Sequence, residues 1–453
     1  MNKNLDYLYD EYLKAHEAEV LKSLPKFTER VEHMPLRYGR FAIPTFYKAH
    51  FISFEQEHLL KRVAAALASV LNIAIRLYFE ERHFSHLFRI PPEAAELIKI
   101  DPGYSQAIIF SRYDALLEGQ SLKLIDFNSD TSAGAGYSDH LEQMLLEDPL
   151  LSDFFKENQM KRSARVQGIL DTLLAVYEEF GGLETPKIAI MDWRDVRALP
   201  EMEYLKKFFE SKGYKTTLAD PRELKFKGGK LYHKDFRIDI IYRRTTLDEL
   251  IARLDEVQDL IKAYRARAVC MVNPLRARLA SSQALVSILT NPEYDHFFTE
   301  SENQVKRECI PWTRRMIDVE AFYGGKKLYA IDFLKEEKES LVLKPSVGYT
   351  GKGVTIGVET RDQDWNEALG RALKEDWIVQ EYVNVPIMTV PRIINEKLDF
   401  DYKKFTFNAL VFGGKYVGGF TKLSQDTVVN VIRSGGFMPS ISSEAMPERL
   451  MQN

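Results

Sequence analysis

The chain has 453 residues, of which 45% are hydrophobic and 28% charged, and its formal net charge is −4. This length exceeds what one ordinary hydrophobic core organises, so we expect two or three packed units of a globular protein. The near balance of charge gives no bulk attraction to nucleic acid or to an anionic membrane, and we predict neither partner. Cys270 and Cys309 could pair, but they do not resemble a disulfide framework or a metal-spaced cluster, and we expect two buried thiols in a reducing cytosol.

Residues 1–104 are predicted to form a mostly helical region, because apolar residues recur every three or four positions. The first 20 residues are polar with this helical period and do not resemble a signal peptide, so we expect a cytoplasmic protein. The most apolar stretch, residues 63–75, is shorter than a membrane span and is flanked by arginines, so we expect a core helix there.

Residues 106–128 are predicted to form two strands joined by the turn EGQS. On the second strand, Asp126 and Asn128 alternate with apolar residues and therefore share one face, and Asp114 could lie opposite them across the hairpin. Two carboxylates and an amide oxygen form the hard-oxygen site that Mg²⁺ prefers. Arg112 shares the face of Asp114 and could hold an anionic group. The alternative is a polar strand face in solvent.

Helices are expected to about residue 181, and a compact α/β unit over residues 187–244 follows them. Its strand–helix–strand spacing predicts a parallel sheet. After a further helix near 246–265 and the strand AVCMVNP, strands should alternate with a helix in WNEALGRALK. The strands expected in this part are KLYAIDF (327–333), SLVLKPS (340–346), GVTIGVE (353–359), WIVQEYV (377–383), FTFNALVF (405–412), KYVGGFTKLS (415–424) and TVVNVI (427–432).

The stretch LVLKPSVGYTGKGVTIG (341–357) combines a strand that ends at Lys344 with a glycine-rich turn. Backbone N–H groups in such a turn can converge on an anion, and glycine lets the backbone approach phosphate oxygens closely. It does not match the P-loop, since Gly351-Lys352-Gly353 leads into a strand instead of a helix. An ordinary hairpin is the alternative.

Two later stretches carry polar residues in apolar surroundings. The strand WIVQEYV contains Gln380 and Glu381 and could present its backbone to an adenine edge, although an ordinary core strand is the alternative. Near the C-terminus, Lys422 and Asn430 lie close to glycines, as in a site lined by backbone and a cation.

Together these motifs resemble the circularly permuted ATP-grasp ligases, and more closely the branch that includes glutathionylspermidine synthetase. In that branch the metal-binding strands come early in the chain and the nucleotide-binding strands late, as here. The Arg-x-Asp strand reads Arg112-Tyr113-Asp114, and the Glu-x-Asn-x-Asp-Ser/Thr strand reads Asp126-Phe127-Asn128-Ser129-Asp130-Thr131. The Lys-Pro with its glycine-rich loop is Lys344-Pro345 with Gly348, Gly351 and Gly353, and the hinge strand is Gln380-Glu381-Tyr382-Val383.

The resemblance covers roughly residues 105–440 and implies an α+β and α/β architecture with a circularly permuted ATP-grasp fold, a preceding Rossmann-like unit and an N-terminal helical region. The domains expected are a helical region (1–104), metal-binding strands and helices of the ATP-grasp core (105–184), an α/β pre-ATP-grasp-like unit (185–270), and a nucleotide-binding region with a glycine-rich lid loop (271–453).

The resemblance also implies roles for individual residues, with ATP and one or two Mg²⁺ ions as cofactors. The metal ligands would be Asp114, Asp126 and Asn128. Arg112 and Thr131 would bind the acceptor carboxylate or its acyl phosphate, and Lys422 would act with Arg112 near the transferred phosphate. The nucleotide would be held by Lys344, Gly348, Gly351, Lys352, Gly353, Gln380, Glu381, Tyr382 and Val383.

The implied activity is ATP-dependent ligation of a small-molecule or peptide carboxylate to an amine through an acyl phosphate. The chain departs from the family pattern in two places: Asp126 replaces a glutamate, and a second nucleotide-binding lysine near 272–289 is absent, where Arg276, Arg278 and Gln283 are offered instead. Two alternatives therefore stay open. One is a catalytically impaired nucleotide-binding interaction protein, and the other is a small-molecule kinase on the same fold.

Overall fold

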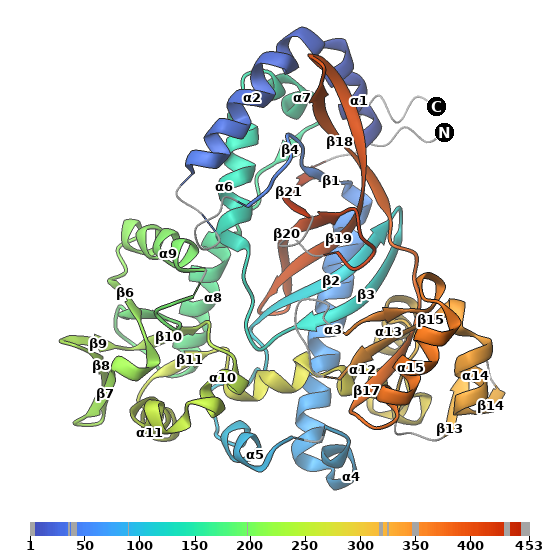
Figure 1. Ribbon diagram of the computed structural model, residues 1–453. Helices are drawn as coiled ribbons and strands as arrows, with labels where there is room; N and C mark the ends of the chain where they lie inside the picture. The colour runs from blue at the N-terminus through green and yellow to red at the C-terminus, as the bar shows by residue number, and fades with distance from the viewer. Residues whose placement is uncertain are drawn as a thin grey trace.

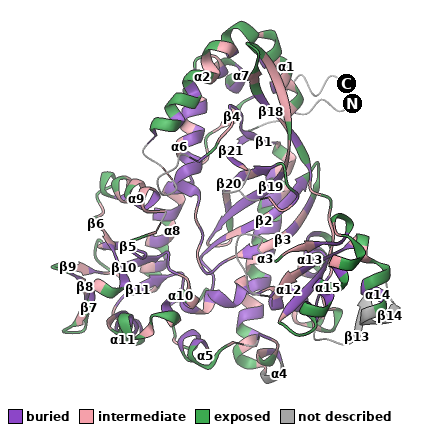
Figure 2. Ribbon diagram, viewed as in Figure 1, coloured by how far each residue is buried: buried purple, intermediate pink, exposed green. Residues whose placement is uncertain are grey.

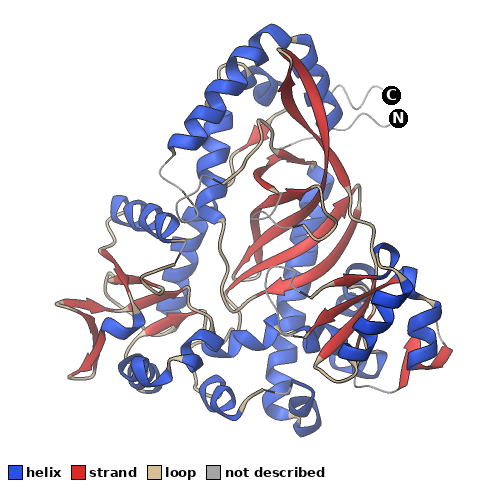
Figure 3. Ribbon diagram, in the orientation of Figure 1, coloured by secondary structure: helices blue, strands red, loops and turns tan. Residues whose placement is uncertain are grey.

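The protein folds as a mixed α/β structure in which helices surround three sheets of four or more strands (Figures 1 and 3). It is a computed structural model. The residues that it describes are 5–34, 37, 43–88, 90–196, 198–316, 320–323, 326–346, 353–429 and 435–444.

The largest sheet has eight strands and lies at the centre of the molecule (Figure 1). Its main path runs β1-β21-β20-β19-β2-β3, β18 pairs with the first part of β19, and β4 pairs with β21. Only the β1–β21 pair is parallel. The strands are β1 (His50–Ile52), β2 (Phe110–Glu118), β3 (Ser121–Asn128), β4 (Met160–Lys161), β18 (Ile387–Ile394), β19 (Lys397–Phe412), β20 (Lys415–Ser424) and β21 (Gly436–Ser443).

Tight hairpins build this sheet. The predicted strand–turn–strand unit over 106–128 is confirmed as β2 and β3. Gly413 and Gly414 connect β19 to β20, with φ angles of 52° and 78°. Two successive positive φ angles give the turn whose twist matches a β-hairpin, and glycine adopts them without strain.

The N-terminal region is mostly helical, as predicted, although β1 makes it part of the central sheet. Residues 63–75 belong to the longer helix α3, which Ser53 and Gln56 begin with a reciprocal capping box. The whole of α3 is long and apolar enough to cross a membrane by length and composition, whereas the predicted stretch 63–75 is only its middle part. Its buried face, which includes Leu67 and Leu71, joins the main hydrophobic core. The helices here are α1 (Leu5–Ala15), α2 (Glu17–His33), α3 (Phe54–Glu80), α4 (Arg82–Ser85) and α5 (Pro92–Ile98).

The second sheet confirms the predicted parallel α/β unit. Its order is β11-β10-β5-β6, and every neighbouring pair is parallel. A small antiparallel sheet of β7, β8 and β9 extends from it (Figure 1). The elements from the end of β3 to β11 are α6 (Ala135–Leu146), α7 (Leu151–Glu157), α8 (Arg165–Glu179), β5 (Ile188–Met191), α9 (Leu199–Ser211), β6 (Thr216–Ala219), β7 (Leu224–Lys227), β8 (Lys230–His233), β9 (Phe236–Ile238), β10 (Ile240–Arg243), α10 (Leu247–Ala252), α11 (Gln258–Arg265) and β11 (Cys270–Val272).

The third sheet is antiparallel, has the order β12-β17-β15-β16, and packs with helices beside the central sheet (Figure 1). Its elements and neighbours are α12 (Gln283–Leu289), α13 (Glu300–Cys309), β12 (Thr313–Arg315), β13 (Glu320–Tyr323), β14 (Lys326–Tyr329), α14 (Ala330–Glu336), β15 (Leu341–Pro345), β16 (Thr355–Ile356), α15 (Asp362–Ala372) and β17 (Trp377–Glu381). Short 3₁₀ helices occur at His86–Phe88, Pro221–Glu223, Leu254–Val257, Leu275–Ser281, Pro292–Phe297, Lys338–Ser340 and Gly357–Glu359.

Three strand predictions were wrong in part. KLYAIDF is a strand only to Tyr329, and the helix that follows has an acidic residue in its first turn and a lysine in its last. GVTIGVE is a strand only at Thr355–Ile356. The chain then turns into a short 3₁₀ helix at Gly357, where the backbone passes so close to the Lys338 carbonyl that a Cβ would lie 1.7 Å from its oxygen. In TVVNVI, Thr427 to Val429 are not in a strand, and the remaining three residues lie outside the described residues. The last strand of the central sheet is instead β21, which begins at Gly436.

Buried side chains line the faces of all three larger sheets, while exposed residues gather on the outer helices (Figure 2). Both cysteines are buried and free, as expected. The buried interior also contains charged groups, and these fall into two clusters of different character.

Candidate nucleotide and metal site

Two carboxylates face each other on the central sheet. β2 and β3 pair so that Asp114 lies directly opposite Asp126 and Arg112 opposite Asn128, which confirms the predicted shared face. The Asn128 Nδ2 atom lies 3.2 Å from Asp114 Oδ1 and 3.5 Å from Asp126 Oδ2, so one amide bridges the carboxylate pair. Alternation puts Asp126 and Asn128 on one face, and a register shift between Asp114 and Ala115 brings Asp114 opposite Asp126.

Cations surround Asp114. Arg112 Nε donates to Asp114 Oδ1 at 2.7 Å, and Lys422 Nζ donates to Asp114 Oδ2 at 3.0 Å. Lys422 comes from β20, two strands away, and the cationic groups of both Arg112 and Lys422 lie 5.9 Å from the centre of the Phe420 ring. The structure thus brings together the predicted metal-binding and phosphate-binding residues, which are separated by about 300 positions in the chain.

Burial and mutual repulsion set the protonation of this group. Burial alone would raise the pKa of Asp114, but Arg112 and Lys422 outweigh burial and hold that pKa below its ordinary value. Burial, and then the negative charge of Asp114, raise the pKa of Asp126. The two carboxylates are therefore driven apart in pKa, as happens where like charges share a site. A second cation near Asp126 would offset this repulsion.

Lys344 approaches the pair from the neighbouring sheet. Its Nζ donates to Gln380 Oε1 at 2.6 Å and to the backbone oxygen of Ile125 at 3.3 Å, beside Asp126. Burial lowers the pKa of Lys344 to about 8, and the negative charge of Asp126 opposes the decrease. Gln380 in turn donates to Thr313 Oγ1 at 2.9 Å, which fixes its orientation. The predicted Lys-Pro strand and the Gln-Glu strand are thus neighbours that meet the carboxylate strands.

The other predicted nucleotide-binding residues are placed as follows. β17 ends at Glu381, whose backbone N–H donates to the Trp312 carbonyl, and Tyr382 donates to the Ser340 carbonyl at 2.7 Å. Gly353 has a φ of 85°, and a Cβ there would lie 2.9 Å from Pro345 Cγ, so the position favours glycine. Val383 follows half-buried, and Thr131 lies half-buried between β3 and α6. Gly348, Gly351, Lys352 and Asn430 lie outside the described residues.

Arg276, Arg278 and Gln283, which the sequence offers in place of the second nucleotide-binding lysine, differ in whether they reach the site. Arg276 donates to the Ile100 carbonyl at 2.8 Å, away from the carboxylates. Arg278 pairs with Asp248 at 3.0 Å. Gln283 is the one that reaches the site, since its Nε2 donates to Asp126 Oδ1 at 2.9 Å.

Sequence reasoning missed two residues of this face. Asn408 on β19 lies directly opposite Asp114, and Phe420 lies opposite Asn408 on β20. The register therefore forms a row from Phe420 through Asn408 and Asp114 to Asp126. An asparagine within the apolar strand FTFNALVF was the available signal, because a buried amide needs a partner.

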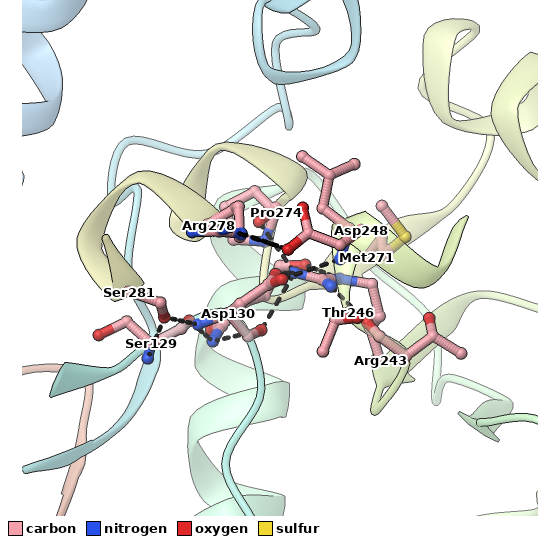
Figure 4. Close-up of polar contacts among 12 residues, drawn as sticks. Ser129, Asp130, Arg243, Thr246, Asp248, Met271, Pro274, Arg278 and Ser281 are labelled. Atoms are coloured by element: carbon pink, nitrogen blue, oxygen red, sulfur yellow. Dashed lines mark hydrogen bonds and ion pairs between the residues drawn. The ribbon is translucent and has the colours of Figure 1, made fainter. Parts of the chain in front are cut away.

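Asp130, the second acidic residue of the motif strand, does not point into this row. It forms a separate buried cluster with Arg243 at the end of β10 (Figure 4). Arg243 Nη2 donates to Asp130 Oδ1 at 2.6 Å, and the Leu247 backbone N–H donates to Oδ2 at 2.8 Å. Ser281 Oγ accepts from the backbone N–H groups of both Ser129 and Asp130 at 2.9 Å (Figure 4). This cluster anchors the end of β3 to the parallel sheet.

The donor set of the carboxylate row fits Mg²⁺. Among the described residues no three His, Cys, Asp or Glu side chains gather in a group that could hold a metal ion. The row instead offers two carboxylates and side-chain amides, which are oxygen ligands for a hard cation. The Asn128 amide would have to present its oxygen in place of its nitrogen. Burial and the negative charge of Asp114 raise the pKa of Asp126, and Lys344 and Arg112 oppose this increase only in part.

Comparisons with known proteins bear on this arrangement. A family model described as glutathionylspermidine synthase preATP-grasp matches residues 22–394. A solved structure of a glutathione synthetase-like effector from Globodera pallida, in its apoform, is similar with a TM-score of 0.59 and 11% identity over 94% of this chain and 97% of that chain. A putative gamma-glutamylcysteine synthetase from Methylobacillus flagellatus has a TM-score of 0.38 and 12% identity over 79% and 82%, too low to support an argument.

The search of curated proteins finds no match. The effector structure supports the fold alone, because its sequence identity is low. The family model covers most of the chain, including the carboxylate strands, the Lys-Pro strand and the Gln-Glu strand. The chain belongs to the glutathionylspermidine synthase preATP-grasp family.

Proposed function

We propose that this protein is an ATP- and Mg²⁺-dependent carboxylate–amine ligase that forms an amide through an acyl phosphate. The observation that supports it best is the facing pair Asp114 and Asp126, with Arg112 and Lys422 on one flank and Lys344 on the other. Such a set can bind a metal–triphosphate and an anionic acceptor side by side. Family membership supports the same reaction class.

In the proposed first step, a carboxylate oxygen of the acid attacks the γ-phosphorus of ATP and ADP leaves, which gives an acyl phosphate. An amine nitrogen then attacks the acyl carbon, phosphate leaves, and the amine loses a proton. Bound Mg²⁺ would offset charge on the phosphate oxygens and align them for in-line transfer. Asp114, Asp126 and Asn128 would hold it.

The remaining residues would position and neutralise. Arg112 and Thr131 would orient the acid's carboxylate, and Lys422 would offset charge on the transferred phosphoryl group. Lys344 and the strand from Gln380 to Val383 would hold the adenine side. The glycine-rich loop would close over the phosphates and exclude water that hydrolyses the acyl phosphate.

The substrates we propose are a small-molecule or peptide carboxylate and an amine, in the cytoplasm. The test is ADP formation by the purified protein with ATP and Mg²⁺, challenged with pooled amino acids, glutathione and polyamines. ADP release that requires one acid and one amine, and that is lost in the Asp126→Ala/Asn128→Ala variant, is the expected result. ADP release that proceeds without an amine, with phosphate retained on the product, would identify a kinase and contradict the ligase.

One observation favours a nucleotide-binding protein without turnover as the second candidate. Asp126 has a shorter reach than the family's glutamate, and its Oδ1 already accepts from Gln283 and from the Phe127 backbone N–H at 2.9 Å. A direct comparison decides between them: Asp126→Glu should raise the ADP-forming rate if Asp126 limits turnover. If neither the wild type nor Asp126→Glu forms ADP with any of the substrate pools, while both bind ATP, the result would favour the nucleotide-binding protein.

A further inference from the structure

Asn408 lies in the middle of the candidate site, although no motif pointed to it. It is fully buried on β19, with Asp114 directly opposite on one side and Phe420 directly opposite on the other. Directly paired residues of neighbouring strands project from the same face of a sheet. The Asn408 side chain therefore emerges on the face that carries the carboxylate pair.

The amide of Asn408 is only half satisfied. Its Nδ2 donates to the Thr406 carbonyl at 3.0 Å and lies 3.4 Å from Thr406 Oγ1, so contacts along the same strand hold the nitrogen. Its Oδ1 is buried and has no hydrogen-bond partner among the described residues. An unpaired buried acceptor carries a desolvation penalty, and native structures tolerate few of them without a reason.

The nearby donors do not relieve this oxygen. Arg112 and Lys422 both donate to Asp114, the residue opposite Asn408. Two cationic side chains bind one carboxylate, and the amide oxygen beside it is left without a donor among the described residues. A bound cation satisfies such an oxygen without a hydrogen atom.

We propose that Asn408 Oδ1 is a ligand of the divalent cation at the Asp114–Asp126 pair, in addition to Asn128. This inference rests on the proposed function, because it assumes that a divalent cation binds there. Mg²⁺ takes six oxygen ligands in an octahedron, and substrate phosphates and water usually supply most of them. An amide oxygen at Asn408 would add a protein ligand on the β19 side of the carboxylates. It would also tie the cation to the strand that carries no other acidic residue of the row.

The test measures Mn²⁺ binding by the loss of the free-ion electron paramagnetic resonance signal, with and without AMP-PNP, after subtraction of binding by the nucleotide alone. We expect Asn408→Ala to weaken Mn²⁺ binding by about 10-fold or more. Asn408→Asp should tighten it by a similar factor, because ligand charge raises cation affinity. Asn158→Ala is the matched control, since Asn158 is also buried but bonds within its own helix end.

A second readout separates ligation from a structural role. Asn408→Asp places a third carboxylate in the row, so without metal its Tm should fall below that of the wild type. Saturating Mn²⁺ should then raise its Tm by more than it raises that of the wild type. An Asn408→Ala variant that keeps the wild-type Mn²⁺ affinity, while Asp114→Asn loses it, would overturn the role of Asn408 and leave the ligase proposal standing. Absence of Mn²⁺ binding by the wild type would overturn both.

Discussion

The buried charge cluster around Asp114 and Asp126 and the one around Asp130 differ in how fully their polar atoms are paired. Around Asp130, both carboxylate oxygens accept hydrogen bonds, and Arg243 also donates to the carbonyls of Asn273 and Thr245. Around Asp114 and Asp126, two like charges face each other and the Asn408 oxygen has no described partner. The first cluster is complete without a ligand, whereas the second is not.

This difference teaches which acidic residues of one short motif serve the fold and which serve chemistry. Asp126 and Asp130 are four residues apart in the same motif, and the sequence analysis predicted Asp126 as a metal ligand but assigned no role to Asp130. Saturated hydrogen bonding indicates a structural role, because nothing remains for a ligand to supply. Repulsion and an orphaned acceptor indicate a site whose partner is external. The predictions below test that distinction.

The largest effect on stability is expected at the paired cluster. Replacing Arg243 with methionine or Asp130 with asparagine leaves the other member buried without its charge partner, and should lower the free energy of unfolding by about 3–5 kcal/mol. Urea denaturation followed by circular dichroism measures it. A loss below about 1 kcal/mol for both variants would show that pairing at Asp130 does not mark a structural cluster.

The largest effect on activity is expected at the cluster around Asp114 and Asp126. Asp114→Asn keeps the size of the side chain but removes a charge that we propose binds the metal, so the ADP-forming rate should fall by about 10²–10³-fold or more. Arg112 and Lys422 lose their carboxylate partner in this variant, but the repulsion with Asp126 disappears at the same time. Its effect on the free energy of unfolding should therefore be smaller than that of Asp130→Asn. Measuring both quantities on both variants completes the comparison, and equal stability losses would contradict it.

Local pattern sufficed for the elements that build the carboxylate pair. Alternation placed Asp126 and Asn128 on one face, and the EGQS turn predicted the hairpin. The register of the turn alone would pair Asp114 with Ile125, and a register shift between Asp114 and Ala115, which the pattern did not predict, brings Asp114 opposite Asp126. Gln283 and Asn408 could not be placed from the sequence, because their contacts join residues 157 or more positions apart or depend on which strand pairs with β2. Tertiary pairing of that kind leaves no local period.

Two other strands of the central sheet could not be predicted from the sequence pattern. β18 contains Pro391 and β21 contains Pro439, and proline within a run argues against a strand. The run TVVNVI was predicted as a strand in place of β21, because strand propensity favours β-branched residues. In β21 burial of all eight residues overrides that preference, so packing and not propensity decided the fold there.

A smaller effect than that of Asp114→Asn is expected on nucleotide binding, as a pH dependence that arises from Lys344. Burial lowers its pKa to about 8, so its charge is lost as pH rises through that value, and affinity for AMP-PNP should fall by up to about 10-fold between pH 7 and pH 9. Lys344→Arg should flatten this profile, because arginine stays charged. Fluorescence or calorimetric titration at each pH measures it, and a flat wild-type profile would contradict a role for Lys344 at the phosphates or base.

Stability should respond to the same group with the opposite sign. The folded-state pKa of about 8 lies below the unfolded value of about 10.4, so between these pH values the unfolded chain binds more protons at Lys344. Its contribution to the free energy of unfolding therefore rises with pH in that window. Wild type should gain stability relative to Lys344→Met from pH 8 to pH 10, while its nucleotide affinity falls.

The smallest effect is expected at an exposed link between the central sheet and the sheet that carries Lys344. Lys404 Nζ lies 3.4 Å from Glu359 Oε1, and Thr427 bridges the two side chains, which are 32% and 46% exposed. Solvent screens such a pair, so Lys404→Gln, Glu359→Gln and their combination should give a coupling energy below about 1 kcal/mol in a double-mutant cycle. The coupling should shrink further in 0.5 M salt. A coupling energy as large as that between Arg243 and Asp130 would contradict this prediction. It would mean that complete hydrogen bonding stabilises the protein even at the surface, so that burial does not distinguish the Asp130 cluster from the candidate site.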